Sequence, residues 1–448
     1  MNGYFIIDGN VKICADKKMN NDSVKRLLKS FCLKNEDFKI AEGKELTFCI
    51  GKADIPKLSA EKEFAICVTE TGAAVVGKDY GGLMRGFFSL LMKIEQEKDV
   101  LKIKTVTEES NYNIKNRMIH ICVFPENDLY YVKKLIRLCA LCQYTHIVIE
   151  FWGMLKFESL KELSWPQAFT KDEAKELIKE CGELGIEPIP MFNQLGHASG
   201  SRGCYGKHVV LEQNPNLQHL FTPDGWAWDI NSGEVVSLLK EIRKELYELF
   251  GKGEYIHLGC DEAHYITHNK DLRKNLAKYL ADLTNEVERE GRCPMIWMDM
   301  LLEKDTFKNC YATGEKEEVG HIRNSTAKST VFVDWQYDCI EAPIPSLASL
   351  KDCGRKVMGA PWFNKNNYNV HIKTIEENEM FGIMLTTWHT LNRFMSSILG
   401  CAKNCGAKTF YWSDFSGLNE ETATILRKVS FEGNNYAQSG WSKAQIDI

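Results

Sequence analysis

Two adjacent carboxylates, Asp261 and Glu262, follow a short apolar run at residues 255–259 that contains His257. The run is bracketed by glycines and predicts a buried strand of a parallel sheet. In barrels and open α/β folds, chemistry is carried by residues that follow the carboxyl ends of such strands. Because two neighbouring acids cannot both stay ionised and desolvated cheaply, one is a candidate for a raised pKa and general-acid chemistry. A helix N-terminus, which favours acidic residues, is the alternative.

Charge and cysteine usage narrow the class of protein. The 448-residue chain has a net charge of −5, so we expect neither a nucleic-acid partner nor an anionic membrane. No window approaches the roughly 18 apolar residues of a membrane span, and we see no signal peptide at the N-terminus. The close cysteine pairs Cys139/Cys142 and Cys401/Cys405 lack zinc-site spacing, which favours buried free thiols. We expect a cytoplasmic protein with no metal and no other cofactor.

The organisation of the chain changes near residue 110. Residues 1–110 predict a small mixed α/β domain, and residues 111–448 predict a catalytic barrel with a C-terminal tail, from Thr409, packed on it. Strand-like runs lie at 118–123, 146–151, 187–192, 255–259, 294–298, 330–335, 357–360 and 383–388. Helical patterns lie between them at 130–142, 171–184, 232–250, 272–290, 344–353 and 370–379, with another at 391–405. Eight such units predict a (β/α)₈ barrel, with a doubly wound sheet as the alternative. The pattern is weakest between the fifth and sixth strands.

The carboxyl ends of the predicted strands carry acids and tryptophans. These ends hold Glu150, Trp152, Asn193, His197, Asp261, Glu262, Trp297, Asp299, Trp335, Trp362 and Trp388. Flat apolar faces of sugars stack on indole rings, while carboxylates and amides bind the hydroxyls, so this set indicates a carbohydrate site. A single tryptophan could instead cover the barrel mouth, but four together favour a pocket.

The motif around the acid pair resembles a known signature. The sequence His257-Leu258-Gly259-Cys260-Asp261-Glu262 is similar to the His-x-Gly-Gly-Asp-Glu motif of glycoside hydrolase family 20, the β-N-acetylhexosaminidases, with Cys260 replacing the second glycine. Residues 64–94 resemble the small domain that precedes the barrel in that family. Further matches, in chain order, are Arg117 to the sugar-binding arginine, Gly196-His197 to the Gly-His pair, residues 295–299 to the strand-five Trp motif, and Trp335 and Trp388 to two pocket tryptophans.

The resemblance implies a retaining exo-hydrolase that releases terminal β-linked N-acetylhexosamine from an oligosaccharide or glycoside. The 2-acetamido oxygen of the sugar would attack its own anomeric carbon, giving an oxazolinium intermediate, an exception to the two-carboxylate scheme. Asp261 would orient and stabilise the acetamido group. Glu262 would protonate the leaving oxygen and then activate water.

The resemblance also suggests binding and supporting roles. Trp297, Trp335 and Trp388 would wall the acetamido group and ring, and Arg117 would clamp ring hydroxyls. His197, Asp299 and Trp362 complete the substrate-binding candidates. His257 and Asn193 are candidate supports of the acid pair, with a buried core histidine as the alternative for His257.

Several positions depart from the family pattern. Asn193 stands where an Asp is usual, Phe363 replaces a tyrosine whose role Tyr368 could take, and Thr390 and Cys122 replace acids. A divergent enzyme acting on a modified or unusual amino sugar is therefore a hypothesis.

Two other classes stay open. A metal-dependent hydrolase could use Asp261, His264 and His268, which are spaced three and four residues apart. A non-catalytic sugar-binding relative is the other alternative. A nucleotide-binding enzyme is poorly supported, because no strand leads into a glycine fingerprint.

Overall fold

The computed structural model of the chain describes residues 3–9, 11–33, 38–41, 46–199, 210–391, 393–408 and 417–430. Its larger part is a closed barrel of eight parallel strands that follow one another in chain order. They are β10 (Asn116–Cys122), β11 (His146–Glu150), β12 (Glu187–Met191), β13 (Tyr255–His257), β14 (Cys293–Trp297), β15 (Val331–Asp334), β16 (Lys356–Gly359) and β17 (Gly382–Thr386). Pairing of Met118 with Met384 joins β17 to β10 and closes the barrel. The predicted (β/α)₈ barrel is confirmed.

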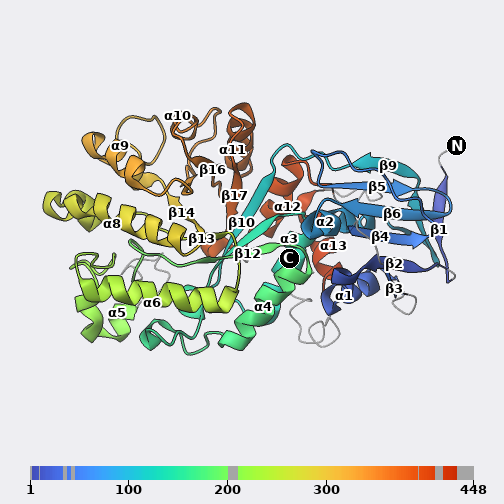
Figure 1. Cartoon of the computed structure of the whole chain (residues 1–448), viewed down its shortest axis with the longest axis horizontal. Helices are drawn as coiled ribbons and strands as arrows, with labels where there is room; N and C mark the ends of the chain where they lie inside the picture. The colour runs from blue at the N-terminus through green and yellow to red at the C-terminus, as the bar shows by residue number, and fades with distance from the viewer. Residues whose placement is uncertain are drawn as a thin grey trace.

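Helices surround the barrel (Figure 1). They are α3 (Leu129–Leu141), α4 (Lys171–Glu183), α6 (Gly233–Phe250), α8 (Lys270–Arg289), α9 (Lys316–Ser325), α10 (Pro345–Ser349), α11 (Lys365–Glu377) and α12 (Met395–Asn404), with the short α5 (Val210–Gln213) and α7 (His264–His268) in connections. Side-chain caps set several of their starts: Asp128 accepts from the Tyr131 N–H, and Thr170 forms a capping box with Glu173. Helix α9 was not predicted, and α10 is shorter than the predicted 344–353.

The barrel interior is a packed core. Side chains from alternate strand positions fill it, including Met118, Val148, Ile189, Met295, Val331 and Met384. Because every barrel strand is covered on both faces, its sequence is a continuous apolar run. This burial explains why the strand positions were predictable.

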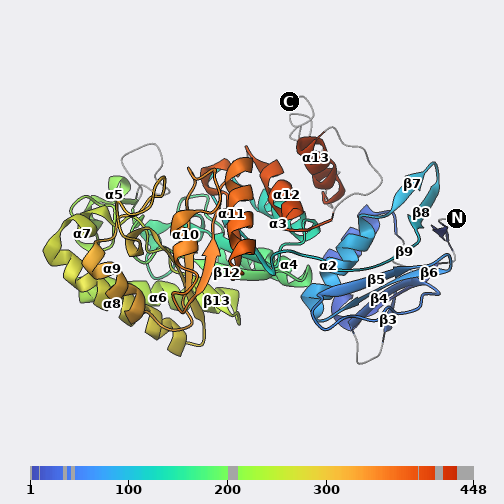
Figure 2. The ribbon, with the colours of Figure 1, turned by 90° about the horizontal axis from the view of Figure 1, so that it is seen from above.

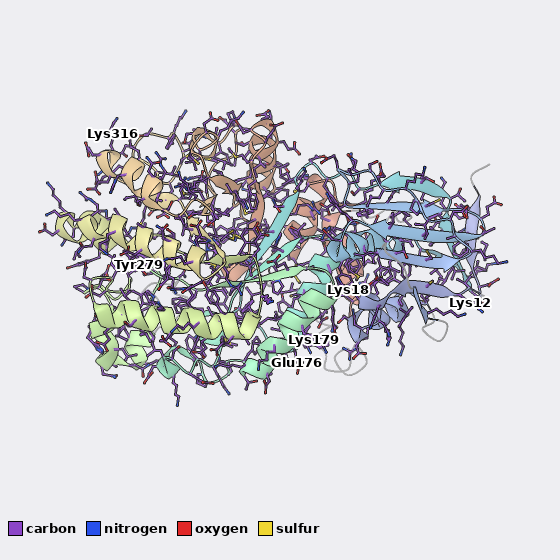
Figure 3. All side chains as sticks on the ribbon, viewed as in Figure 1. Lys12, Lys18, Glu176, Lys179, Tyr279 and Lys316 are labelled. Atoms are coloured by element: carbon purple, nitrogen blue, oxygen red, sulfur yellow. The ribbon has the colours of Figure 1, made fainter. Side chains whose placement is uncertain are left out.

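The small domain packs against the amino ends of the barrel strands. Its main sheet has the order β3 (Phe38–Ala41), β2 (Ile13–Asp16), β4 (Leu46–Gly51), β6 (Gly72–Gly77), β5 (Phe64–Val68) and β9 (Val106–Glu109). A second sheet joins β1 (Tyr4–Ile7), β8 (Val100–Lys104) and β7 (Glu95–Glu97), and the helices are α1 (Asp22–Ser30) and α2 (Tyr80–Leu91). Helix α2 lies on β5 and β6 and contacts α3 of the barrel (Figure 2). The labelled Lys12 and Lys316 lie at opposite ends of the molecule (Figure 3).

Arg117 joins the two domains. It is the second residue of β10, is 1% exposed, and donates to both carboxylate oxygens of Glu63 at 3.2 and 3.3 Å. It also donates to the Ile114 carbonyl at 2.7 Å and lies over the Tyr112 ring. These contacts hold it at the amino end of the barrel, while the acid pair follows the carboxyl end of β13. The prediction that Arg117 clamps sugar hydroxyls is therefore wrong; it docks the small domain.

The described part of the tail is α13 (Leu418–Lys428), which packs on α12 and α3. An ion pair of 2.6 Å between Lys403 and Glu421 ties it to α12. Residues 409–416 and the chain after 430 lie outside the described residues. In the described ranges, every helix is too short or too polar to cross a membrane.

Candidate active site

A strained loop after β13 presents the acid pair. Gly259, Cys260 and Glu262 all have left-handed backbones, with φ of 67°, 69° and 50°. A Cβ on Gly259 would lie 1.9 Å from the Asn193 Oδ1, so the close approach of β12 requires glycine there. Cys260 adopts the left-handed backbone without being glycine, which is uncommon and occurs where the surroundings hold the loop. The substitution in the motif therefore preserves the shape of the loop.

His197 lies between the two acids. Its Nε2 is 3.2 Å from the Asp261 Oδ2 and 3.0 Å from the Glu262 Oε2. The preceding Gly196 approaches so closely that a Cβ there would lie 1.8 Å from the Asp261 carbonyl oxygen. On the other side, the Trp226 ring lies 4.5 Å from the imidazole, and its Nε1 donates to the Glu262 carbonyl at 2.8 Å. The Gly-His pair thus fixes the acid pair through packing and hydrogen bonds.

A third carboxyl group, Asp299, lies behind the pair. It is 1% exposed, and its Oδ2 accepts the Glu262 backbone N–H at 2.9 Å. Burial and the neighbouring Asp261 raise the pKa of Asp299 well above its usual range. This shift favours the neutral form of Asp299, whose Oδ2 can still accept the Glu262 backbone N–H. This contact makes Asp299 a positioning residue for Glu262.

Two of the predicted tryptophans meet above His257. The Trp297 ring centroid is 4.3 Å from that of His257 and 5.8 Å from that of Trp388. His257 also accepts the Gly259 N–H at 3.1 Å, so it supports the loop that carries the acids. Trp297 is fully buried, whereas Trp388 is partly exposed. Trp297 therefore supports the site from below, and Trp388 is the ring that reaches the surface.

The remaining tryptophans belong to a row of aromatic rings. Ring centroids lie 5.0 Å apart for Tyr311 and Trp335, 5.2 Å for Trp335 and Tyr337, and 5.3 Å for Tyr337 and Trp362. The Tyr337 hydroxyl accepts from the Trp388 Nε1 at 2.8 Å and joins that ring to the row. The structure thus brings the predicted strand-end tryptophans together. It adds two tyrosines that the sequence argument missed, because both lie in loops without periodicity.

Both tyrosines lie near the acids. Tyr311 lies close to Glu262, and burial together with the charge of Glu262 raises the pKa of the Tyr311 phenol. Burial raises the pKa of the Tyr337 phenol as well, with Asp261 and Glu262 adding to it. Tyr368, which the sequence offered as the missing phenol, is buried on α11 with its hydroxyl against Gly400 of α12. That prediction is wrong, and Tyr337 is the phenol among the pocket tryptophans.

A buried polar group forms the barrel floor beneath these rings. The His120 Nε2 lies 2.9 Å from one Glu150 oxygen, and Asn193 donates to the other at 3.1 Å. Cys122 lies close to both His120 and Glu150. The His120 ring is 4.6 Å from that of Trp388. Asn193 thus supports the site twice, through Glu150 and through its contact with Gly259.

The proposed metal set is not assembled. Among the described residues, two groups bring possible ligand atoms within 4.8 Å of one another: His120, Cys122 and Glu150, and His197, Asp261 and Glu262. His264 reaches only to 4.0 Å from Glu262, and His268 is in neither group. The alternative of a metal site formed by Asp261, His264 and His268 is therefore wrong.

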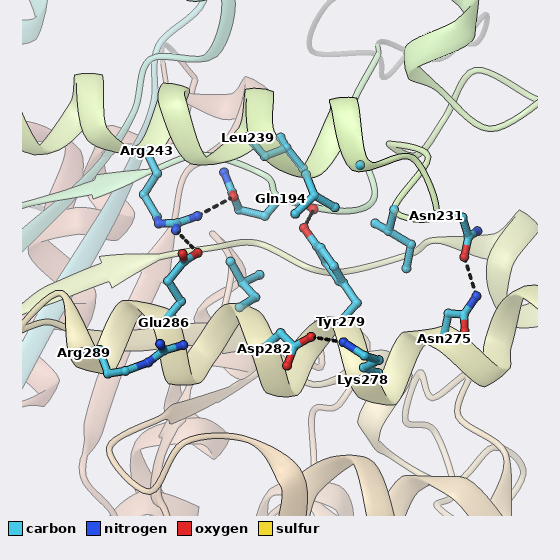
Figure 4. Close-up of a pocket in the computed structure, with 14 residues that line it drawn as sticks. Gln194, Asn231, Leu239, Arg243, Asn275, Lys278, Tyr279, Asp282, Glu286 and Arg289 are labelled. Atoms are coloured by element: carbon cyan, nitrogen blue, oxygen red, sulfur yellow. Dashed lines mark hydrogen bonds and ion pairs between the residues drawn. The ribbon is translucent and has the colours of Figure 1, made fainter.

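The loop that carries His197 is held from outside the barrel. Gln194 accepts from Arg243 of α6 at 3.4 Å through its side chain, and from the Tyr279 hydroxyl of α8 at 2.5 Å through its carbonyl (Figure 4). Arg243 is itself paired with Glu286. A pocket between α6 and α8 is lined by these residues. These two helices therefore set the position of His197.

The carboxyl end of the closed parallel barrel thus carries adjacent acids, a bridging histidine and clustered tryptophans, a combination suited to binding a sugar. The family model of glycosyl hydrolase family 20, catalytic domain, matches residues 149–340. This part of the chain is therefore similar to that catalytic domain.

The relatives are distant. The chain is 24% identical over 307 residues to lacto-N-biosidase of Bifidobacterium bifidum, covering 62% of this chain and 26% of that protein. It is 23% identical over 171 residues to hexosaminidase D of Homo sapiens, covering 35% of this chain and 33% of that protein. These matches span about a quarter to a third of the curated relatives.

Solved structures show the same fold. The chitobiase of Flavobacterium johnsoniae superposes with a TM-score of 0.69 at 16% identity, covering 97% of this chain and 71% of that one. The β-N-acetylhexosaminidase of Bacteroides fragilis superposes with a TM-score of 0.67 at 14% identity, covering 99% and 94%.

Proposed function

We propose that this protein is a retaining exo-β-N-acetylhexosaminidase that works by substrate-assisted catalysis. The observation that carries the proposal is the shared contact of His197 with Asp261 and Glu262, at 3.2 and 3.0 Å. The contact holds two neighbouring carboxylates in fixed and different surroundings, as a charge stabiliser and a proton donor require. The names of the chitobiase and the hexosaminidases among the similar proteins support the same substrate class.

The two acids have different environments. Asp261 is 4% exposed and faces His197 and the buried Asp299, so it is suited to hold the acetamido group and the positive charge that develops on it. Glu262 is more exposed, and contacts His197 and Tyr311, so it can exchange a proton with a leaving oxygen and with water. Trp388, Trp335 and Tyr337 would pack on the sugar.

The test is hydrolysis of nitrophenyl N-acetyl-β-glucosaminide by the parent, Asp261→Asn and Glu262→Gln proteins. Loss of an acid–base group costs about 10²–10⁴ in rate, so both variants should fall by that factor. An exposed carboxylate variant, Asp282→Asn, is the matched control and should keep parental turnover. A thiazoline that mimics the oxazolinium ion should inhibit the parent. Turnover in Glu262→Gln equal to that of the parent would contradict the proposed role of Glu262 as proton donor.

The glycone is tested separately. A panel of aryl β-glycosides of N-acetylglucosamine, N-acetylgalactosamine, sulfated and free-amine sugars and lacto-N-biose covers the hypothesis of an unusual amino sugar. The disaccharide is included because lacto-N-biosidase is among the relatives. Hydrolysis of N-acetylglucosaminide far above all others would reject an unusual glycone.

A metal-dependent hydrolase is the second candidate, because the ligand atoms of His197, Asp261 and Glu262 lie close enough to share an ion. Exhaustive chelation separates the two. Full activity after chelation, with no metal by elemental analysis, supports the substrate-assisted enzyme, whereas activity restored by added Zn²⁺ supports the metal.

A further inference from the structure

Two thiols from separate loops meet beside the aromatic row. The Sγ atoms of Cys310 and Cys339 are 3.7 Å apart. Cys310 lies between β14 and α9, and Cys339 lies between β15 and α10. Cys310 is partly exposed and Cys339 is buried. One thiol is thus open to a small reagent while its neighbour is shielded.

Backbone contacts already hold the two loops together. The Tyr311 N–H donates to the Gln336 Oε1 at 2.6 Å, and the Gln336 side chain donates back to the Tyr311 carbonyl at 3.1 Å. The Cys339 thiol donates to the Asn309 carbonyl at 3.0 Å. The sulfurs therefore need only approach from 3.7 Å to the about 2.0 Å of a disulfide, with the loops kept in register.

The surroundings make Cys310 the more reactive thiol. The contact with Cys339 lowers the pKa of Cys310 to about 6 against the opposing effect of burial. The same contact with Cys310, and burial, raise the pKa of Cys339. The lowered pKa favours the thiolate form of Cys310, which is the form that attacks disulfides.

We propose that Cys310 and Cys339 form a reversible disulfide that links the loop of Tyr311 to the loop of Tyr337. The oxidant is a small disulfide such as oxidised glutathione. The Cys310 thiolate attacks one of its sulfurs, forms a mixed disulfide and releases one glutathione thiolate. Cys339 then loses its proton, attacks the Cys310 sulfur and releases the second glutathione. Two protein thiols are oxidised, and one glutathione disulfide is reduced to two thiols.

The link acts on the candidate acid through Tyr311. Tyr311 follows Cys310 directly in the chain and lies close to Glu262. Drawing the sulfurs together moves the Tyr311 backbone relative to Glu262, and displacements of about 1 Å near a reacting group cost up to about 10²-fold in rate. We expect turnover to fall about ten-fold in the oxidised protein. This effect on turnover rests on the proposed function, whereas formation of the disulfide does not.

The experiment equilibrates the full chain with oxidised glutathione, alkylates the remaining thiols, and maps peptides by mass spectrometry. The parent should give a peptide pair joined at Cys310 and Cys339. Cys339→Ser should stop at a glutathione adduct on Cys310, and Cys310→Ser should leave Cys339 alkylated only after denaturation. Cys353→Ser, a partly exposed thiol elsewhere, is the matched control and should behave as the parent.

Turnover is measured on the same samples. Oxidation should lower it in the parent, dithiothreitol should restore it, and Cys310→Ser should not respond. Quantitative alkylation of Cys310 in the oxidant-treated parent would overturn the disulfide. Unchanged turnover in a fully linked, active parent would overturn its control of the site. A parent that hydrolyses none of the substrates would instead refute the proposed function, and peptide mapping would still decide the disulfide.

Discussion

The backbone N–H of Glu262 donates to the Asp299 carboxyl at 2.9 Å, so a buried acid from β14's end fixes the main chain of an acid that follows β13. Burial and the neighbouring Asp261 raise the pKa of Asp299, which favours the neutral form of this carboxyl group. Through this hydrogen bond, the position of β14 helps to set the position of Glu262, the candidate proton donor that follows the neighbouring strand β13.

Replacing Asp299 tests this relationship. Asp299→Asn keeps an oxygen that accepts the Glu262 N–H and carries no charge, so turnover should stay within about ten-fold of the parent. Asp299→Leu removes the acceptor and should lower turnover by about 10²-fold, the usual effect of a misplaced catalytic group. Steady-state kinetics on both proteins decides the matter. Equal losses in the two variants would mean that the charge of Asp299, not its hydrogen bond, is what matters.

Asp334 makes stability depend on pH. It is fully buried, and burial raises its pKa to about 6, although Ser346 and Gln336 donate to it. Because the folded pKa lies above the unfolded one, the folded state holds the extra proton between pH about 4 and about 6. The stabilisation is complete below the unfolded pKa and is lost as pH rises through about 6.

The stability of Asp334→Asn relative to the parent should therefore increase as pH rises. Between pH about 4 and above about 6 the difference in unfolding free energy should move by about 3 kcal/mol in favour of the variant. Urea unfolding of both proteins across this range measures it. A difference that stays constant with pH would contradict the assignment.

Arg117 distinguishes docking from sugar binding. Arg117→Lys cannot reproduce the paired hydrogen bonds to the partly buried Glu63, so it should lower stability by about 1.5–3 kcal/mol. We expect a lower melting temperature with KM within about two-fold of the parent. Calorimetry and substrate titration give the two readouts. A raised KM at an unchanged melting temperature would restore the sugar-binding role.

Gly196→Ala should damage the acid pair. A Cβ there would lie 1.8 Å from the Asp261 carbonyl, so the loop must shift. Overpacking of this kind costs about 1–3 kcal/mol, and turnover should fall about 10²-fold. Gly182→Ala in α4 is the control, because nothing lies within 4 Å of its Cβ and alanine favours the helix by about 1 kcal/mol. Parental kinetics in Gly196→Ala would show that the loop adapts.

The barrel could be predicted because its buried strands are unbroken apolar runs whose ends carry the polar residues. Helix α9 could not, because its ten residues bury only Val319 and Ile322 and leave little periodicity. Because the segment between the fifth and sixth strands has little periodicity, the sequence did not predict that Tyr311 lies in the site.

The site residues divide along similar lines. Asp261 and Glu262 could be predicted because they directly follow an apolar strand run. His197 could be predicted because it follows Gly196, a position where close packing requires glycine. The roles of Tyr311 and Tyr337 depend on Gln336 and on facing loops, which no local pattern encodes. Arg117 precedes the predicted strand at 118–123, so the strand direction alone places it at the amino end of the barrel. The family resemblance, in contrast, implied a sugar contact.

Glu63 binds two arginines at once, Arg117 of the barrel and Arg85 of α2, at 3.2 and 2.5 Å. Although burial opposes its ionisation, the two guanidinium groups hold the pKa of Glu63 below its usual range. Without the small domain, the buried guanidinium of Arg117 would lose its carboxylate partner. In descendants of this chain, Glu63 and Arg117 should therefore be inherited or exchanged together, and a barrel transplanted without its small domain should need a new partner for that guanidinium.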